Sequence, residues 1–122
     1  MILSLYVVMN LNTSNKNYIK GVKSLITGKQ RSYLKSLAHK LEPIFQVGKN
    51  GITENFIKQV DEALEKRELI KIKVLNNSLL DAKEVANMLA EKTNAEFVQS
   101  IGNKFVLYRE SKKHKKIILP EK

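Results

Sequence analysis

The 122-residue chain contains no cysteine, and its two histidines, His39 and His114, lie far apart in the sequence. Without cysteine, neither a disulfide framework nor a thiolate metal site can form, which is compatible with a reducing cytosol. The separated histidines have no clustered partners that could complete a metal site. We therefore expect no metal and no cofactor, and a cytoplasmic location.

The sequence also lacks an apolar run long enough to span a membrane. The run from Met1 to Met9 has no basic residues before it and no small-residue cleavage site after it, so it resembles neither a signal peptide nor an anchor. The residues that follow it are rich in Asn, Lys and Ser without periodicity, which is typical of a flexible segment. We expect residues 1–24 to be a flexible extension or an over-called start of the coding sequence.

Motifs of catalysis are missing as well. The Gly28-Lys29 pair is followed by Gln30 and lacks the upstream glycine of a phosphate-binding loop, so nucleotide hydrolysis has no motif. Asp61, Glu62 and Glu65 share one charged helix face with lysines, which is typical of a solvated surface. We predict a protein that is not an enzyme and has no small-molecule substrate.

Basic residues dominate the charge of the chain, which is +10 at pH 7, with a pI near 9.8. Residues 27–51 hold five basic residues and one acidic residue, and residues 98–122 hold seven and two. Residues 52–97 hold seven basic and nine acidic residues, so the middle of the chain is close to neutral. Basic surfaces attract polyanions, and this distribution favours nucleic acid as the partner.

A first helix is predicted between Thr27 and Pro43. Thr27 and Gln30 have the spacing of a capping box, apolar residues follow at helical spacing, and Pro43 ends the helix. The outer face of this helix is expected to carry Lys29, Arg31, Lys35 and Lys40.

Four short apolar segments are predicted to be strands. They are residues 44–47, 69–75, 95–101 and 104–109. The second alternates Ile70, Ile72 and Val74 with two lysines, which predicts a half-buried strand. The last two are joined by Gly102 and Asn103, whose leading glycine suits a type II′ turn.

Two more helices are predicted between these strands. One is capped by Thr53, and the other begins at Ser78 and ends near Thr93 and Asn94. The order is a helix followed by β-α-β-α-β-β. This order predicts a two-layer α/β fold in which the last two helices cover one face of a four-stranded mixed sheet.

A glycine turn joins the first predicted strand to the second helix. Gly48 and Gly51 enclose Lys49 and Asn50, so a nucleic-acid backbone could approach this turn without meeting a Cβ atom. The amino end of the following helix is electropositive, and Gly-x-x-G loops clamp nucleotide backbones in KH domains. A single such turn is weak support, but a basic helix accompanies it here.

Three segments carry a resemblance to a known family: "LAHKLEPIFQVGKNGIT", "ELIKIKV" and "IGNKFVLYR", in this order and spacing. They resemble the YhbY family of bacterial RNA-binding proteins, the stand-alone form of the CRM (chloroplast RNA splicing and ribosome maturation) domain. The resemblance runs from about Leu25 to Pro120. It implies a fold similar to the C-terminal domain of translation initiation factor 3 and binding to rRNA in precursors of the large ribosomal subunit.

The resemblance also implies which residues bind RNA. They are Gly48, Lys49, Asn50 and Gly51 in the glycine loop, Lys29, Arg31, Lys35, His39 and Lys40 in the first helix, and Arg109 after the last strand. We expect residues 25–110 to form the RNA-binding domain and residues 111–122 a basic tail. We expect a monomer, because no apolar surface stripe demands a dimer.

Structural interpretations remain open for several of these residues. The basic helix face could be an ordinary solvated surface, His39 could pack against Pro43 or cap the helix end, and Arg109 could close the edge of the hairpin. The C-terminal lysines are by default a flexible solubilising tail. Tyr33 and Tyr108 could stack on bases, although aromatic residues at such positions usually belong to the core. A general RNA- or DNA-binding protein without a ribosomal role is the alternative function.

Overall fold

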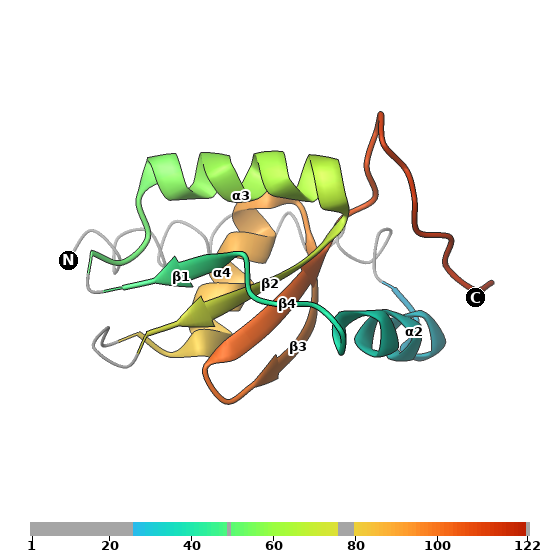
Figure 1. Ribbon diagram of the computed structural model, residues 1–122, viewed down its shortest axis with the longest axis horizontal. Helices are drawn as coiled ribbons and strands as arrows, with labels where there is room; N and C mark the ends of the chain where they lie inside the picture. The colour runs from blue at the N-terminus through green and yellow to red at the C-terminus, as the bar shows by residue number, and fades with distance from the viewer. Residues whose placement is uncertain (1–25, 49, 76–79, 122) are drawn as a thin grey trace.

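The computed structural model describes residues 26–48, 50–75 and 80–121 (Figure 1). The helices are α2 (Gly28–Ala38), α3 (Glu54–Arg67) and α4 (Ala82–Thr93), and the strands are β1 (Phe45–Val47), β2 (Leu69–Val74), β3 (Glu96–Ile101) and β4 (Lys104–Tyr108). This order confirms the predicted α/β fold. The predicted extension, residues 1–24, lies outside the described residues.

Local hydrogen bonds at the first two helix starts agree with the sequence pattern. The amide of Gln30 donates to Thr27 Oγ1 at 3.1 Å, and the amide of Thr27 donates to Gln30 Oε1 at 3.0 Å. These two bonds complete the predicted capping box of α2. Thr53 caps α3 by accepting a hydrogen bond from the amide of Phe56 at 3.0 Å.

The last helix begins later than predicted. Ser78 lies outside the described residues, and α4 starts at Ala82, where Asp81 accepts a hydrogen bond from the amide of Glu84 at 3.2 Å. Asp81 is the N-cap of α4, and aspartate is as good an N-cap residue as serine. The helix ends as predicted at Asn94, which adopts a left-handed conformation with φ 59°.

The sheet has the strand order β1-β2-β4-β3 and is mixed. Strands β1 and β2 are parallel, and the other two pairs are antiparallel. Gly102 has φ +61° whereas Asn103 has a negative φ, as a type II′ turn requires. The register of β3 against β4 shifts between Phe97 and Gln99, which marks a bulge in the edge strand.

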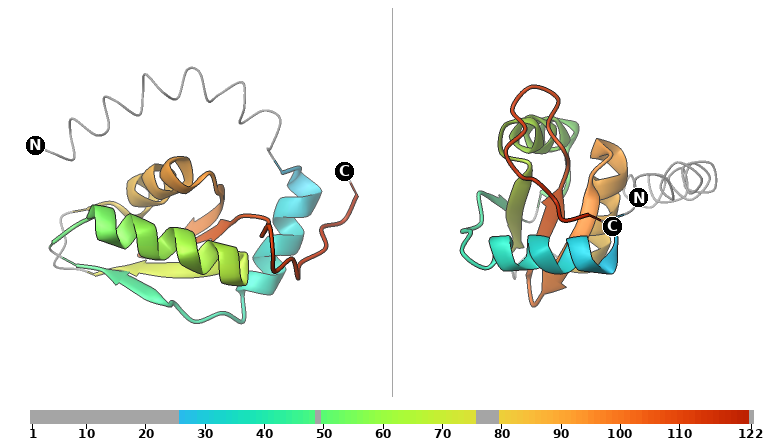
Figure 2. Two further views of the ribbon diagram at one scale, coloured as in Figure 1. Left: turned by 90° about the horizontal axis from the view of Figure 1, so that it is seen from above. Right: turned by 90° about the vertical axis from the view of Figure 1, so that its right-hand side faces the viewer.

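Two apolar clusters cover opposite faces of the sheet. Helices α3 and α4 pack on one face through residues such as Leu64, Leu89, Ile72 and Phe105. Helix α2 packs on the other face, and Figure 2 shows it set apart at one end of the molecule. Its cluster contains the buried residues Leu34, Ala38, Leu69, Val98, Val106 and Tyr108. The sheet therefore has one face with two helices and one face with a single helix at its end.

Candidate nucleic-acid interface

The glycine turn lies directly after β1 at one end of the sheet. The amide of Gly51 donates to the carbonyl of Gly48 at 3.0 Å, which closes the turn. Gly51 has φ +71°, a conformation that L-residues rarely adopt, so glycine is required there by the backbone. A Cβ atom at Gly48 would lie 3.6 Å from Leu75, which is an ordinary contact. Lys49 lies outside the described residues.

Helix α3 begins beside this turn, and its amino end combines features that attract an anion with features that weaken the attraction. Its amino end carries the positive partial charge of the helix dipole, which favours an anion. Thr53 already satisfies one of the free amides, and Glu54 places a negative charge in the first turn. The helix end alone is therefore a modest anion site, and a strong one would need the added charge of neighbouring lysines.

Four exposed basic side chains lie on α2 and directly after its last residue. They are Lys29, Lys35, His39 and Lys40. The first turn of α2 contains no acidic residue, and within the described part of the chain none of the four forms an ion pair. Unpaired positive charge on one short helix produces a local field that attracts phosphate. Contact of these side chains with RNA stays a prediction.

Arg31 differs from the other basic residues of α2. It was expected on the outer face, but its side chain is half-buried and Nη1 donates to the carbonyls of Phe97 and Val98, the latter at 3.2 Å. These carbonyls lie at the bulge of β3, where regular pairing is interrupted. Arg31 thus satisfies backbone acceptors and fixes α2 to the edge strand.

Arg109 is also engaged within the molecule. Its guanidinium forms a salt bridge with Asp61 at 2.5 Å and donates to the carbonyls of Asp61 and Thr93 at 2.9 and 2.7 Å. The side chain is only 19% exposed. It joins the end of β4 to both α3 and the end of α4. The structural interpretation of Arg109 is therefore supported by three contacts within the chain.

The C-terminal segment is held by the end of α3, although it was expected to be flexible. Glu68 is fully buried and accepts hydrogen bonds from the amides of Ser111, Lys116 and Ile117 at 2.7, 2.7 and 2.8 Å. The carbonyl of Pro120 accepts a further bond from the side chain of Gln30 at 2.9 Å. Residues 111–120 are thus part of the folded structure.

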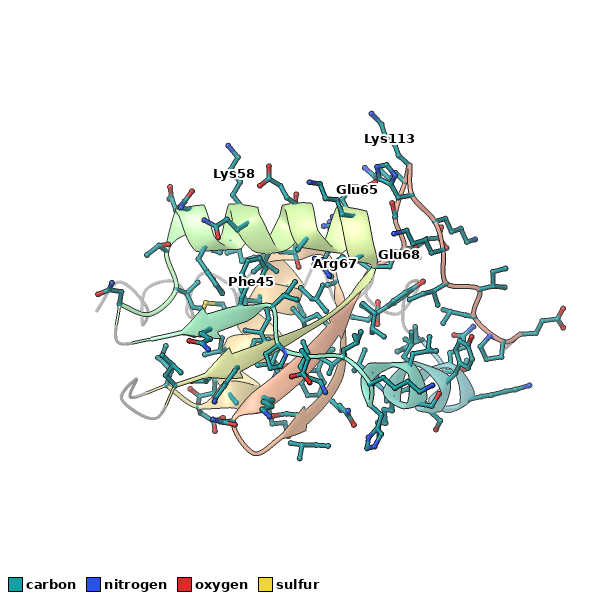
Figure 3. All side chains as sticks on the ribbon, in the orientation of Figure 1. Phe45, Lys58, Glu65, Arg67, Glu68 and Lys113 are labelled. Carbon is teal, nitrogen blue, oxygen red and sulfur yellow. The ribbon has the colours of Figure 1, made fainter. Side chains whose placement is uncertain are left out.

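Glu65 provides a second attachment for this segment, as Figure 3 shows near Lys113. Its carboxylate accepts from the hydroxyl of Ser111 at 2.7 Å and from the amides of Lys112 and Lys113 at 3.2 and 3.0 Å. The Ser111 hydroxyl and then the two amides lower the pKa of Glu65 from 4.5 to about 2. Burial raises the pKa of Glu68, but its three amide donors outweigh this effect and the net shift is downward.

The two tyrosines with an open interpretation differ in exposure. Tyr108 is buried in the α2 cluster, and burial, followed by nearby carboxylates, raises its pKa to about 12. It belongs to the core and has no exposed ring face for a base. Tyr33 is 39% exposed on α2.

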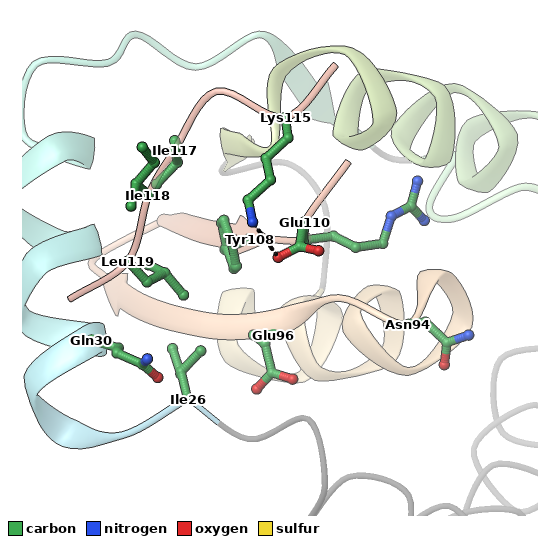
Figure 4. Close-up of a pocket in the computed structure, with 11 residues that line it drawn as sticks. Ile26, Gln30, Asn94, Glu96, Tyr108, Glu110, Lys115, Ile117, Ile118 and Leu119 are labelled. Atoms are coloured by element: carbon green, nitrogen blue, oxygen red, sulfur yellow. Dashed lines mark ion pairs between the residues drawn. The ribbon is translucent and has the colours of Figure 1, made fainter. Parts of the chain in front are cut away.

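A cleft of about 530 Å³ opens between α2, the end of β4 and the C-terminal segment (Figure 4). Its lining combines apolar residues such as Ile117 and Leu119 with Glu96 and with Glu110, which pairs with Lys115 at 3.5 Å. Carboxylates in the lining disfavour a phosphate ligand. Among the described residues, no cluster of three or more acidic, His or Cys side chains could hold a metal ion.

The glycine loop and the basic face of α2 lie at opposite ends of the sheet (Figure 1). The sequence predicted that both regions bind RNA but did not indicate how far apart they lie. Strand β2 runs from the α2 end to the loop end, and its six residues span roughly 17 Å at about 3.3 Å per residue.

None of the described helices is long and apolar enough to cross a membrane.

Comparison with known proteins finds one matching family and several similar proteins. The CRS1 / YhbY (CRM) domain matches residues 26–109. The chain is 54% identical over 96 residues to "Probable RNA-binding protein YqeI" of Bacillus subtilis, covering 79% of this chain and all of the relative. An "RNA-binding protein" of Haemophilus influenzae is 40% identical over 97 residues, covering 80% and 97% of the two chains. The solution structure of the hypothetical protein SAV1595 from Staphylococcus aureus is similar with a TM-score of 0.67 and 58% identity, covering 79% of this chain and all of that one.

Proposed function

The chain belongs to the CRS1 / YhbY (CRM) domain family, and on this premise we propose that it binds RNA and acts as an assembly factor on precursors of the large ribosomal subunit. The observation that carries RNA binding is the unpaired basic face of α2, formed by Lys29, Lys35, His39 and Lys40. The names of the relatives support the same partner. The ribosomal role rests on the family resemblance.

The mechanism is binding without turnover. The glycine loop and the amino end of α3 hold backbone phosphate, because the turn admits a close approach at Gly51 and Lys49 adds a positive charge. The basic face of α2 supplies further phosphate contacts. Recognition is then mostly of RNA shape and backbone.

Arg31 and Arg109 have a different role in this proposal. Each donates to carbonyls of the chain itself, so neither guanidinium is free to form a full set of bonds with phosphate. Arg31 positions α2 against β3, and Arg109 positions the end of β4 against α3 and α4. They are positioning residues, and the contact role belongs to the exposed lysines and the loop.

On a pre-ribosomal particle, such binding would hold an rRNA segment in place in the cytoplasm until later proteins arrive. The alternative is a general RNA- or DNA-binding protein with no ribosomal role. Competition at equal salt separates the two, since an assembly factor prefers structured rRNA to duplex DNA, whereas a protein that senses only phosphate density binds both.

Cosedimentation with ribosomal particles tests the proposal. We compare the wild type with Lys49→Glu, which reverses a loop charge and leaves the required Gly51 intact, at low and moderate salt. Lys58→Glu is the matched control, because Lys58 is exposed on α3 and points away from the sheet (Figure 3). Circular dichroism first establishes that all three proteins fold.

The expected result is association of the wild type and the control with large-subunit precursors, and loss of association for Lys49→Glu. Equal association of the two variants with large-subunit precursors would mean that the glycine loop is only a structural turn. Absence of wild-type association with large-subunit precursors would contradict the assembly role.

A further inference from the structure

Side chains on the sheet face opposite α3 and α4 form a continuous row across all four strands. In the register, Lys73 of β2 lies between Gln46 of β1 and Lys104 of β4, and Lys104 in turn pairs with Ile101 of β3. Paired residues share a face of the sheet. Two residues before Lys73 along β2, Lys71 lies on the same face. It pairs with Val106 of β4, which also pairs with Gln99 of β3. We define the open sheet face as Gln46, Lys71, Lys73, Gln99, Ile101 and Lys104.

This face is partly accessible, because three of its six residues are exposed and three are half-buried. In Figure 1, β1, β2 and β4 are seen with no helix in front of them, α4 lies behind them, and α2 lies beyond their right-hand ends. Gln46 and Lys104 are exposed, Ile101 is 68% exposed, and Lys71, Lys73 and Gln99 are half-buried.

The charge of the open sheet face has one sign. Three of its six residues are lysines and none is acidic, and these lysines form no ion pair within the described part of the chain. Lys73 and Lys104 are direct cross-strand partners. Like charges in that position repel and destabilise a sheet, so this arrangement is unfavourable for the isolated fold, and an anion between the lysines would relieve the repulsion.

The position of the open sheet face is as informative as its charge. It extends from the middle of β2 to the end of the sheet where β1 and β2 finish and the glycine loop begins, and α2 lies at the other end. Neighbouring lysines are separated by about 5 Å across the strands and by about 7 Å along β2. These separations allow one polyanionic strand to contact all three lysines.

We propose that the open sheet face binds the sugar-phosphate backbone of an RNA strand that runs between the glycine loop and α2. The inference rests on the proposed RNA-binding function and names the surface and the part of the RNA involved. The face has no aromatic residue, so backbone contact replaces base stacking. Gln46 and Gln99 offer amide groups that both donate and accept, as a ribose 2′-hydroxyl requires.

Fluorescence anisotropy over a range of salt concentrations tests the inference. The probe is a single-stranded oligouridylate of about 15 nucleotides, which has no fixed secondary structure. The open-face variant is Lys71→Gln/Lys73→Gln/Lys104→Gln. The matched control is Lys58→Gln/Lys66→Gln/Lys83→Gln, which removes three exposed lysines from α3 and α4 on the opposite face.

The open-face variant is expected to bind at least about tenfold more weakly than the wild type at moderate salt. The slope of log affinity against log salt is expected to decrease in magnitude by about 2, since each phosphate contact on a single strand contributes about 0.7. The control is expected to keep the wild-type slope. Lys71→Arg/Lys73→Arg/Lys104→Arg is expected to retain binding, because it preserves all three charges.

Thermal melting separates binding from folding. The open-face variant is expected to melt at or above the wild-type temperature, because it removes the repulsion between Lys73 and Lys104. A loss of affinity in a protein of undiminished stability cannot come from unfolding.

Equal slopes for the open-face variant and the control would overturn the inference. A wild type that cosediments with large-subunit precursors but does not bind oligouridylate would also overturn it, while leaving the proposed function intact. A wild type that binds neither would overturn both.

Discussion

Two charged regions of this molecule are built in opposite ways. At the end of α3, Glu65 and Glu68 accept six hydrogen bonds from the C-terminal segment of the same chain. On α2 and the open sheet face, the lysines have no ion-pair partner within the described residues. The comparison teaches that the two carboxylates at the end of α3 are used in folding, whereas the lysines of α2 and of the open sheet face remain available to a partner.

Burial follows the same division. Glu68 is fully buried, and a buried carboxylate is tolerated only when its oxygens are hydrogen-bonded. Lys29, Lys35, Lys40 and Lys104 are exposed, where an unpaired ammonium group costs little because water solvates it. Substitutions in the acidic region should therefore change stability, and substitutions in the basic regions should change binding.

The largest effect is expected for Glu68→Ala. Removal of the carboxylate leaves three backbone N–H groups without their acceptor, and each loss costs on the order of 1 kcal/mol or more, so the free energy of unfolding should fall by about 3 kcal/mol. Urea denaturation measures the change. Glu62→Ala, at an exposed position of the same helix, is the control and should change stability by less than about 0.5 kcal/mol.

Glu68 also has φ 67°, so a second variant separates its carboxylate from its backbone. Glu68→Gly removes the same hydrogen bonds but relieves the strain of the positive φ, and it should be less destabilising than Glu68→Ala by about 1 kcal/mol. Equal stability of Glu68→Ala and the Glu62→Ala control would contradict the structural role of the carboxylate.

A smaller effect, on binding alone, is expected on α2. The triple variant Lys29→Gln/Lys35→Gln/Lys40→Gln should weaken RNA binding by about tenfold and leave the free energy of unfolding within about 0.5 kcal/mol of the wild type. Titration of labelled RNA and urea denaturation measure the two quantities. A variant that loses stability and keeps its affinity for RNA would contradict this prediction, because the three lysines would then stabilise the fold and not bind RNA.

The smallest effect is expected from the pH dependence of Glu65. Its folded pKa of about 2 lies below the ordinary value of 4.5, so its contribution to stability is fully present above about pH 4.5 and is lost as the pH falls toward 2. Unfolding free energies of the wild type and Glu65→Gln should differ most at neutral pH and converge near pH 2. A difference that stays constant from pH 7 to pH 2 would refute this assignment.

Interactions within four residues could be predicted from the sequence. The capping box of Thr27 and Gln30 and the cap at Thr53 depend only on residue type and spacing, and the structure contains both. The alternation of Ile70 and Ile72 with lysines likewise determined which face of β2 is buried. Local hydrogen bonds and a period of two have few competing solutions.

Interactions between distant residues could not be predicted in the same way. Gln30 bonds to the carbonyl of Pro120, 90 positions away, and Arg31 bonds to the bulge of β3, 66 positions away. Glu65 was expected in solvent because its helix spacing is that of a charged face, yet it binds Lys113, 48 positions away. No local pattern distinguishes a solvated charge from one that a distant segment will cover.

The sequence by itself determined the order of the elements, the family and the basic character of the surface, because these depend on composition, spacing and motifs. Only the tertiary structure decided which charged side chains bond to other parts of the chain and which remain available to a partner. It also separated the glycine loop from α2 and aligned Lys71, Lys73 and Lys104 between them. Strand register and the docking of the C-terminal segment join residues far apart in sequence, so their consequences for charge appear only after the chain has folded.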